Sequence, residues 1–251
     1  LSPVQFTAIG RDEVRRYGVE VLAGRAVDVT RDDRGGFRVG LVGGHTVIAR
    51  RVLAASGLVD ELPDIDGVAE HWGGDVIHCP FCHGYEVRDR RIVQIVTPPS
   101  GLHPSPLLRQ LTDRLTVVLH GDVDRGDPAL APMRAAGVEV RQERVRQVVT
   151  GDDGHVTAVE LVGGDRIGAD AVVVGPGFRA RAEPFATLGL ALVDHPNGLG
   201  RVVETDALGE TSVPGLFAAG NITDPSHQVL QAAAHGSRIG AMISFSLAHE
   251  D

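Results

Sequence analysis

The chain has 251 residues, of which 43% are hydrophobic and 4% aromatic, an ordinary composition with enough apolar side chains to bury a core. Its formal charge of −9 argues against partners such as nucleic acid or an anionic membrane, because phosphate groups are bound by clustered cations. All 24 basic residues are arginine, which excludes a Schiff-base lysine and a P-loop lysine.

The first quarter of the chain predicts a helix, a small antiparallel sheet and a strand. Residues 3–17 can form one helix. Residues 25–48 alternate apolar and polar side chains in short runs broken by Asp-Asp or Gly-Gly, which is typical of a meander. An apolar strand closed by glycine follows at residues 51–57. The chain has no run of about eighteen apolar residues and no signal-peptide pattern near residue 1, so we expect a cytoplasmic protein.

The stretch IHCPFCHGYE at residues 77–86 holds the only two cysteines, Cys79 and Cys82, between His78 and His83. In a reducing compartment such a pair is more plausibly catalytic or metal-binding than a structural disulfide. In a redox couple, one thiolate attacks a disulfide and its partner resolves the mixed intermediate. A zinc site of all four side chains is disfavoured, because adjacent residues point in different directions and no second Cys-x-x-Cys exists. An inert pair of thiols remains open.

The next segment predicts a β–α–β unit, with strands at residues 91–96 and 116–119 around a helix at 106–111. Two motifs of the first quarter then recur. Gly18-Val-Glu-Val returns at Gly137, and Leu41-Val-Gly-Gly returns at Leu161, so the two copies are offset by 119 and 120 residues. A second meander at residues 144–167 and a second apolar strand at 170–175 complete the repeat.

The two copies differ in the part that normally binds a dinucleotide. The pyrophosphate lies on the glycine-rich turn and helix N-terminus of an opening β–α–β unit, and only seventeen residues precede the first copy. In the second copy this turn, at residues 97–106, has four prolines and one glycine, and proline supplies no N–H. We therefore expect no working glycine fingerprint in either copy.

The C-terminal part predicts an apolar strand at residues 215–219 and a final helix. Asn221, His227 and Gln228 lie at the turn between them, where free N–H groups of a helix N-terminus can bind an anion or flavin carbonyl oxygens. Alternatively, Asn221 and residues 224–226 only cap and start that helix.

Three motifs in this order resemble the thioredoxin-reductase-like flavoprotein disulfide oxidoreductases, especially the dithiol oxidase branch that acts on gliotoxin and holomycin. They are Ala-Ala-Ser-Gly ending at Gly57, Cys79-Pro-Phe-Cys-His-Gly, and Gly215-Leu-Phe-Ala-Ala-Gly-Asn followed by His227-Gln228. The resemblance implies an α/β fold of two Rossmann-like, three-layer domains of the glutathione-reductase type, the first incomplete, each with a small antiparallel meander. Residues 1–85 and 203–251 would be the remnant of an FAD-type domain, and residues 86–202 an inserted NAD(P)H-type domain.

The resemblance also implies roles for the site residues. Cys79 would exchange with substrate, Cys82 would face the flavin, and His83 would take a thiol proton. No metal is implied. The residues expected to bind FAD are Ser56, Gly57, Gly220, Asn221, His227 and Gln228.

The implied activity is FAD-dependent dithiol/disulfide exchange on a small-molecule dithiol by a homodimer that does not use NADPH. Two alternatives stay open. A homologue truncated in its FAD-binding part could serve as a cofactor-independent cyclase or isomerase in a biosynthetic pathway. It could also be a partner subunit whose exposed sheet edge is covered by another chain.

Overall fold

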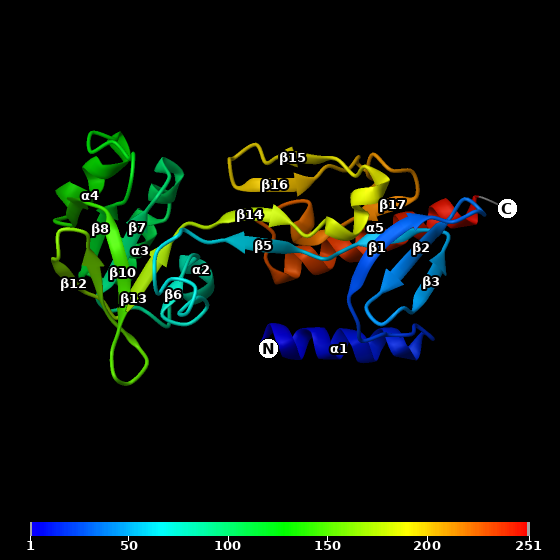
Figure 1. Cartoon of the computed structure of the whole chain (residues 1–251), viewed down its shortest axis with the longest axis horizontal. Coiled ribbons are helices and arrows are strands. Elements are labelled where there is room, and N and C mark those ends of the chain that lie inside the picture. Colours follow the sequence, from blue (N-terminus) through cyan, green and yellow to red (C-terminus); the bar gives the residue numbers. More distant parts are fainter. Residues whose placement is uncertain (1, 250–251) are drawn as a thin grey trace. The chain divides into compact units, whose positions relative to one another are not determined.

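The computed structural model describes residues 2–249, and its internal contacts divide the chain into two units (Figure 1). The continuous unit runs from Asp60 to Gly177. The split unit contains the residues up to Val59 and those from Phe178 onward. None of the described helices is both long and apolar enough to cross a membrane.

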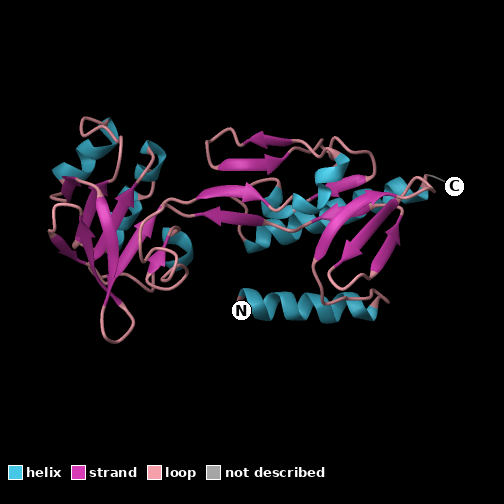
Figure 2. Ribbon diagram, in the orientation of Figure 1, coloured by secondary structure: helices cyan, strands magenta, loops and turns pink. Residues whose placement is uncertain are grey.

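A five-stranded parallel sheet forms the centre of the continuous unit (Figure 2). Its strands, in spatial order, are β6 (Val76–Ile77), β13 (Ala171–Val174), β7 (Ile92–Val96), β8 (Leu115–Leu119) and β9 (Glu139–Gln142). All five residues of β7 are buried, because both faces of the sheet are covered. A strand covered in this way needs apolar side chains on both faces, which explains the four apolar residues in its sequence Ile-Val-Gln-Ile-Val.

Helices cover one face of this sheet and an antiparallel sheet covers the other. Leu108, Leu130 and Met133 pack on the helical side, and Val148 and Val159 pack on the opposite side. The helical elements are α3 (Ser105–Leu111), α4 (Ala131–Ala135), η1 (Pro99–Leu102) and η2 (Pro128–Leu130), and the antiparallel strands are β10 (Val145–Thr150), β11 (Val156–Leu161) and β12 (Arg166–Gly168). The predicted three-layer α/β architecture is confirmed for this unit.

The split unit has a smaller parallel sheet of two strands, β4 (Val52–Ala54) and β17 (Leu216–Ala218). The predicted meander is present as β1 (Ala26–Arg31), β2 (Phe37–Leu41) and β3 (Thr46–Ala49). A core cluster containing Val29, Phe37 and Leu216 joins the meander to the parallel strands. The helical elements are α1 (Pro3–Arg16), η3 (Glu183–Leu188), η4 (Gly220–Ile222) and α5 (Val229–Ala248).

The predicted repeat is present in the backbone as well as in the sequence. Gly18 and Gly137 end α1 and α4 with φ of 80° and 75°, and each N–H donates to a carbonyl three residues earlier at 3.0 Å. These left-handed conformations explain why both positions are glycine. Leu41 and Leu161 open matching turns, in which their N–H groups donate to His45 at 2.8 Å and to Asp165 at 2.9 Å.

The contacts within the chain divide it after Val59 and after Gly177. The domain bounds that the resemblance implies, at residues 85 and 202, stay a prediction. Residues 60–85 contain β6, which pairs with β13 in the continuous unit. Residues 178–202 contain β15 (Leu192–Asp194) and part of β16 (Gly200–Val203), whose four-stranded sheet also includes β14 (Gly177–Ala180) and β5 (Leu58–Glu61). This sheet pairs strands that are distant in sequence, so local patterns do not show it.

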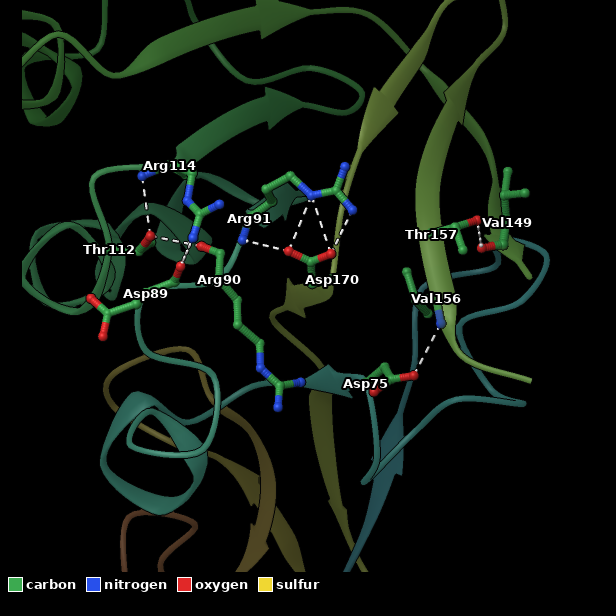
Figure 3. A network of polar contacts seen from close by, with 10 residues as sticks. All are labelled: Asp75, Asp89, Arg90, Arg91, Thr112, Arg114, Val149, Val156, Thr157 and Asp170. Carbon is green, nitrogen blue, oxygen red and sulfur yellow. Dashed lines mark hydrogen bonds and ion pairs between the residues drawn. The ribbon is translucent and has the colours of Figure 1, made fainter. Parts of the chain in front are cut away.

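A polar network fixes the start of β7 in the continuous unit (Figure 3). The backbone N–H of Arg91 donates to the Asp170 carboxylate at 2.9 Å, and the Arg91 Nε donates to it at 3.1 Å. This arginine lowers the pKa of Asp170 to about 2. The Thr112 hydroxyl donates to the carbonyl of Arg90 at 2.7 Å, so the end of α3 is held at the same place.

Candidate functional site

A single helical turn brings the two cysteines together. α2 (Pro80–His83) begins directly after Cys79, and the N–H groups of Cys82 and His83 donate to the Cys79 carbonyl at 3.2 and 3.1 Å. Proline suits the first position of such a turn because its φ is already helical. Side chains three residues apart on a helix lie on the same face. The two Sγ atoms are therefore 2.8 Å apart, both as free thiols.

The Cys82 thiol holds its proton strongly. Partial burial, followed by the hydrogen bond to Cys79 and the charge of that residue, raises the pKa of Cys82 to about 11. In this pair the Cys82 thiol is the donor and the Cys79 sulfur is the acceptor. Near neutral pH the Cys82 thiol therefore keeps its proton.

The two histidines beside the cysteines have different surroundings. The His78 ring stacks on Trp72, with centroids 5.6 Å apart, and the Trp72 Nε1 donates to the Asp60 carboxylate at 3.1 Å. Burial lowers the pKa of His78, against a smaller opposite effect of Asp60. His83 is exposed at the end of α2.

Sequence reasoning missed the contribution of Asp60 and Trp72. Trp72 is the only tryptophan of the chain, a signal that could have drawn attention to it. Among the described residues, no three His, Cys, Asp or Glu side chains are grouped so that they could hold a metal ion.

Aromatic side chains also lie at the surface next to the thiols. Phe81 and Tyr85 are 75% and 71% exposed. The Arg88 guanidinium lies 3.9 Å from the centre of the Tyr85 ring and donates to the Tyr85 carbonyl at 2.7 Å. Exposed aromatic rings beside a reactive group offer contact area to an apolar substrate.

In the split unit, the structure brings together four of the residues predicted to bind FAD. Because β4 and β17 are parallel, Ser56, Gly57, Gly220 and Asn221 follow them at the same edge of the sheet. Gly57 and Gly220 have φ of 71° and 80°. An added Cβ at Gly57 would have no atom within 4 Å, so this backbone lies open to a ligand.

The turn between β17 and α5 differs from the capping prediction. α5 begins at Val229 with Gln228 as its N-cap residue, whose N–H donates to the Gln231 side chain at 2.8 Å. Asp224 instead accepts hydrogen bonds from the N–H and hydroxyl of Ser226 at 2.8 and 2.6 Å. It therefore fixes the preceding turn and does not start the helix.

The Asn221 amide also has a local role in this turn. It donates to the His227 carbonyl at 2.7 Å, which closes the turn from within.

His227 belongs to a histidine cluster around Asp224. The Nε2 atoms of His195 and His227 lie 3.6 and 3.8 Å from the Asp224 carboxylate. The His227 ring meets the His235 ring edge-on with centroids 5.3 Å apart, and His235 accepts the N–H of Gly220 at 3.2 Å. The buried Nδ1 of His227 has no hydrogen-bond partner among the described residues. Sequence reasoning assigned no role to His195 or His235.

These residues fit one part of an FAD site. Two loops at the carboxyl end of parallel strands, followed by the N-terminus of a twenty-residue helix, form a common nucleotide-binding arrangement. The glycine-rich turn that would hold the pyrophosphate is not among the described residues of the split unit.

At the corresponding edge of the continuous unit, the loop is packed against its own sheet. After β7, the Gln94 amide donates to the Gly101 carbonyl at 2.7 Å, and its oxygen accepts the Ser105 hydroxyl at 2.8 Å. Gln94 and Ser105 are each 1% exposed, and Leu102 is 3% exposed. The proline-rich loop is therefore packed down on the sheet where a pyrophosphate would need donor N–H groups.

One protein family matches most of this chain. The profile of the family described as pyridine nucleotide-disulphide oxidoreductase matches residues 5–238. The thioredoxin reductase sirT of Leptosphaeria maculans is 30% identical over 80% of this chain, and the chain spans 64% of that protein. The thioredoxin reductase tcpT of Claviceps purpurea is 28% identical over 98% of this chain, and the chain spans 78% of that protein.

Solved structures share the fold over the whole chain. The crystal structure of HlmI is 36% identical with a TM-score of 0.86, and the chain covers 78% of it. An oxidoreductase from Agrobacterium tumefaciens is 31% identical with a TM-score of 0.88, and the chain covers 82% of it.

Proposed function

Because the chain belongs to the pyridine nucleotide-disulphide oxidoreductase family, we propose that it performs dithiol/disulfide exchange at Cys79 and Cys82 and passes the electrons to FAD. The observation that carries this proposal is the 2.8 Å separation of the two sulfur atoms. It requires only a small movement for the pair to close into a disulfide, whose sulfur atoms are about 2.05 Å apart.

The exchange balances without any further reactant. A substrate thiolate attacks the Cys79 sulfur of the oxidised pair, and the Cys79–Cys82 bond breaks with its electron pair leaving on Cys82. The second substrate thiolate then attacks the substrate sulfur that is bound to Cys79, and the bond between that sulfur and Cys79 breaks with its electron pair leaving on Cys79. The substrate leaves as a disulfide, and after protonation the enzyme keeps two thiols. Two electrons and two protons have moved from the substrate to Cys79 and Cys82.

Because the pKa of Cys82 is raised to about 11, Cys82 is protonated near neutral pH once it has left as a thiolate. His83 is proposed to accept a substrate thiol proton, since it is exposed beside the pair and histidine titrates near neutral pH. His78 is held by Trp72 and is proposed to position Cys79.

FAD, when bound, supplies the two-electron acceptor that returns the pair to the disulfide. Ser56, Gly57, Gly220 and Asn221 would hold it through the loops after β4 and β17, of which the Gly57 backbone is open. His227 and Gln228 would lie at the helix N-terminus beside it. The closed loop after β7 supports an enzyme that takes its electrons from the dithiol and not from NADPH.

The proposed substrate is a small dithiol with an apolar body. Phe81 and Tyr85 support this, because their rings are exposed beside the thiols. Aromatic surface binds apolar groups largely by removing them from water.

The direct experiment is to incubate the protein with FAD, remove the excess, and add dithiothreitol under anaerobic conditions. We expect both proteins to retain the visible absorption of flavin after the excess is removed. Dithiothreitol should then bleach this absorption in the wild type and leave it in Cys82→Ser. A protein that retains no flavin, or flavin that bleaches equally fast in both proteins, would contradict the proposal.

A further inference from the structure

Four side chains around the thiols follow one another at intervals of three residues: Cys79, Cys82, Tyr85 and Arg88. Two direct contacts occur within this set, which we call the thiol row. The Sγ atoms of the cysteines are 2.8 Å apart, and the Arg88 guanidinium lies 3.9 Å from the centre of the Tyr85 ring. Both contacts join residues three apart, which lie on one face of a chain that coils in helical turns.

The backbone of this segment coils in successive turns. Its N–H groups donate to carbonyls three or four residues earlier: Cys82 to Cys79 at 3.2 Å, Gly84 to Pro80 at 2.9 Å, Val87 to Gly84 at 3.3 Å and Arg90 to Val87 at 3.3 Å. Such a coil rises about 1.5–2 Å per residue, so Cys82 and Arg88 are separated by roughly 9–12 Å along it. An arginine side chain and a substrate of a few carbon atoms together bridge this separation.

Two residues fix the segment against α3. Gly84 is buried, and an added Cβ there would collide with the Pro80 carbonyl and the Leu111 side chain. Asp89 is the one described residue other than glycine with a positive φ, 61°, and its N–H donates to the Leu111 carbonyl at 2.9 Å. A strained conformation of this kind persists only where the surrounding structure holds it. The chain therefore leaves the coil at a fixed place, directly after Arg88.

The Arg88 guanidinium is oriented but has no acidic partner. It stacks on Tyr85 and donates through Nη1 to the Tyr85 carbonyl at 2.7 Å. Among residues 2–249, no carboxylate lies within ion-pair distance of it, although Glu86 and Asp89 are close in sequence. Other arginines of the same unit do pair with carboxylates, namely Arg91, Arg109, Arg141 and Arg166.

The thiol row therefore presents two thiols, an exposed aromatic ring and a cation in this order. A guanidinium binds a carboxylate through two parallel N–H groups, and the Nε and Nη2 atoms of Arg88 make no hydrogen bond within the described part of the chain. Because the whole chain carries a charge of −9, an anionic substrate needs such a local cation to be held.

We propose that Arg88 determines specificity in the exchange reaction, and that the preferred substrate carries a carboxylate separated from its dithiol by an apolar chain. The dithiol meets Cys79 and Cys82, the apolar chain lies on Tyr85, and the carboxylate accepts hydrogen bonds from Arg88. This inference rests on the proposed exchange at the thiol pair but not on the proposed binding of FAD.

The test compares two dithiols that differ only in charge. Dihydrolipoate has a dithiol, an alkyl chain and a carboxylate, and dihydrolipoamide has a neutral amide in place of the carboxylate. The 251-residue protein is oxidised with diamide, desalted and mixed with either dithiol under anaerobic conditions, with no flavin added. Samples are quenched with acid at intervals, and the free protein thiols are counted to give a rate constant for reduction of the disulfide.

The measured quantity is the rate constant with dihydrolipoate divided by that with dihydrolipoamide. Arg88→Gln should lower this ratio about threefold, the effect of one exposed ion pair, and leave the rate with dihydrolipoamide unchanged. Arg88→Lys, which keeps the charge without the paired N–H groups, should lie in between. An unchanged ratio in Arg88→Gln, or an equal loss with both dithiols, would overturn the proposal.

Two control variants separate recognition at Arg88 from net charge and from loss of the ring. Arg125→Gln removes the same charge at an exposed residue in the loop after β8 and should leave the ratio unchanged. Tyr85→Phe keeps a ring under the guanidinium and should also preserve the ratio. A fall in Arg125→Gln as large as in Arg88→Gln would refute the assignment. A disulfide that neither dithiol reduces in the wild type would instead refute the proposed exchange, and this inference with it.

Discussion

At the scale of residues, the contact between Cys79 and Cys82 changes how readily Cys82 loses its proton. The two thiols share one hydrogen bond, in which Cys82 is the donor. Partial burial, this hydrogen bond and the charge of Cys79 raise the pKa of Cys82 to about 11, so Cys82 keeps its proton near neutral pH. The contact comes from the helical turn that sets the sulfur atoms side by side.

Replacing Cys79 by alanine should lower the pKa of Cys82. The change removes the hydrogen bond and the charge of Cys79, two of the three causes that raise this pKa, and leaves only burial. The pH dependence of alkylation of Cys82 by iodoacetamide measures it. The apparent pKa should fall toward the ordinary cysteine value, and Cys79→Ser, which keeps an acceptor, should lie in between. An unchanged value near 11 in Cys79→Ala would contradict this account.

Replacing Asp60 by asparagine should lower the pKa of His78 further. The Asp60 charge raises that pKa against the larger effect of burial, and asparagine keeps an oxygen acceptor for the Trp72 Nε1. The ring protons of His78, followed by NMR through a pH titration, report the change. Glu70→Gln removes one negative charge at an exposed residue and serves as the control. It should leave the pKa of His78 unchanged. A rise in the His78 pKa in Asp60→Asn would refute the assignment.

The sequence predicted the thiol pair because Cys-x-x-Cys is a local motif. It did not predict the contacts among Asp60, Trp72 and His78, because they depend on how the chain turns before β6. The cluster of His195, His227 and His235 around Asp224 was missed for the same reason.

At the scale of elements, the ion pair of Arg91 and Asp170 joins β7 to β13. Asp170→Asn should lower the free energy of unfolding of the continuous unit by about 1 kcal/mol at pH 7, a value that allows for solvent screening of this half-exposed pair. Trp72, the only tryptophan, lies in this unit, so its fluorescence during urea unfolding reports the change selectively. Asp113→Asn, whose carboxylate is 88% exposed, should change the stability little.

The same pair predicts how stability depends on pH. The pKa of Asp170 is lowered from 3.8 to about 2, so its stabilising contribution is complete above pH 4 and is lost as the pH falls toward 2. The difference in unfolding free energy between wild type and Asp170→Asn should therefore shrink over this interval. A difference that is constant from pH 7 to pH 2 would contradict the assigned ion pair.

The glycine that ends α4 should be intolerant of a side chain. Gly137 has φ of 75°, and no atom lies within 4 Å of an added Cβ, so Gly137→Ala tests backbone strain alone. We expect a loss of about 1 kcal/mol, measured by Trp72 fluorescence in urea. Ala136→Gly is the control, because it also changes the chain by one methyl group but at a neighbouring residue with a negative φ of −82°. No loss in Gly137→Ala would show that this turn can adopt another conformation.

Most elements could be predicted from the sequence. The helix predicted at residues 3–17 is present as Pro3–Arg16, and both meanders follow the alternation of apolar and polar residues. The start of α5 could not be predicted, because Asp224-Pro-Ser resembles a helix cap but forms a separate turn. The sheet of β5, β14, β15 and β16 was not predicted, since its strands are distant in sequence.

At the scale of the whole molecule, two units of one architecture have different chemistry. The continuous unit has a complete five-stranded sheet, a closed loop after β7 and the thiol pair. The split unit has two parallel strands, and the backbone at Gly57 after the first of them is open. The repeat made this organisation predictable, whereas the boundaries depended on strand pairing that only the structure reveals. The assignment of FAD to the split unit stays a prediction.

The central claim is that Cys79 and Cys82 exchange electrons as one pair, and a redox titration tests it most directly. The protein is equilibrated with mixtures of reduced and oxidised dithiothreitol, quenched with acid, and its free thiols are counted after unfolding. The account predicts that both thiols disappear together in a single two-electron transition, while Cys82→Ser keeps one thiol throughout. Two thiols that persist at every ratio, or that disappear one at a time, would contradict it.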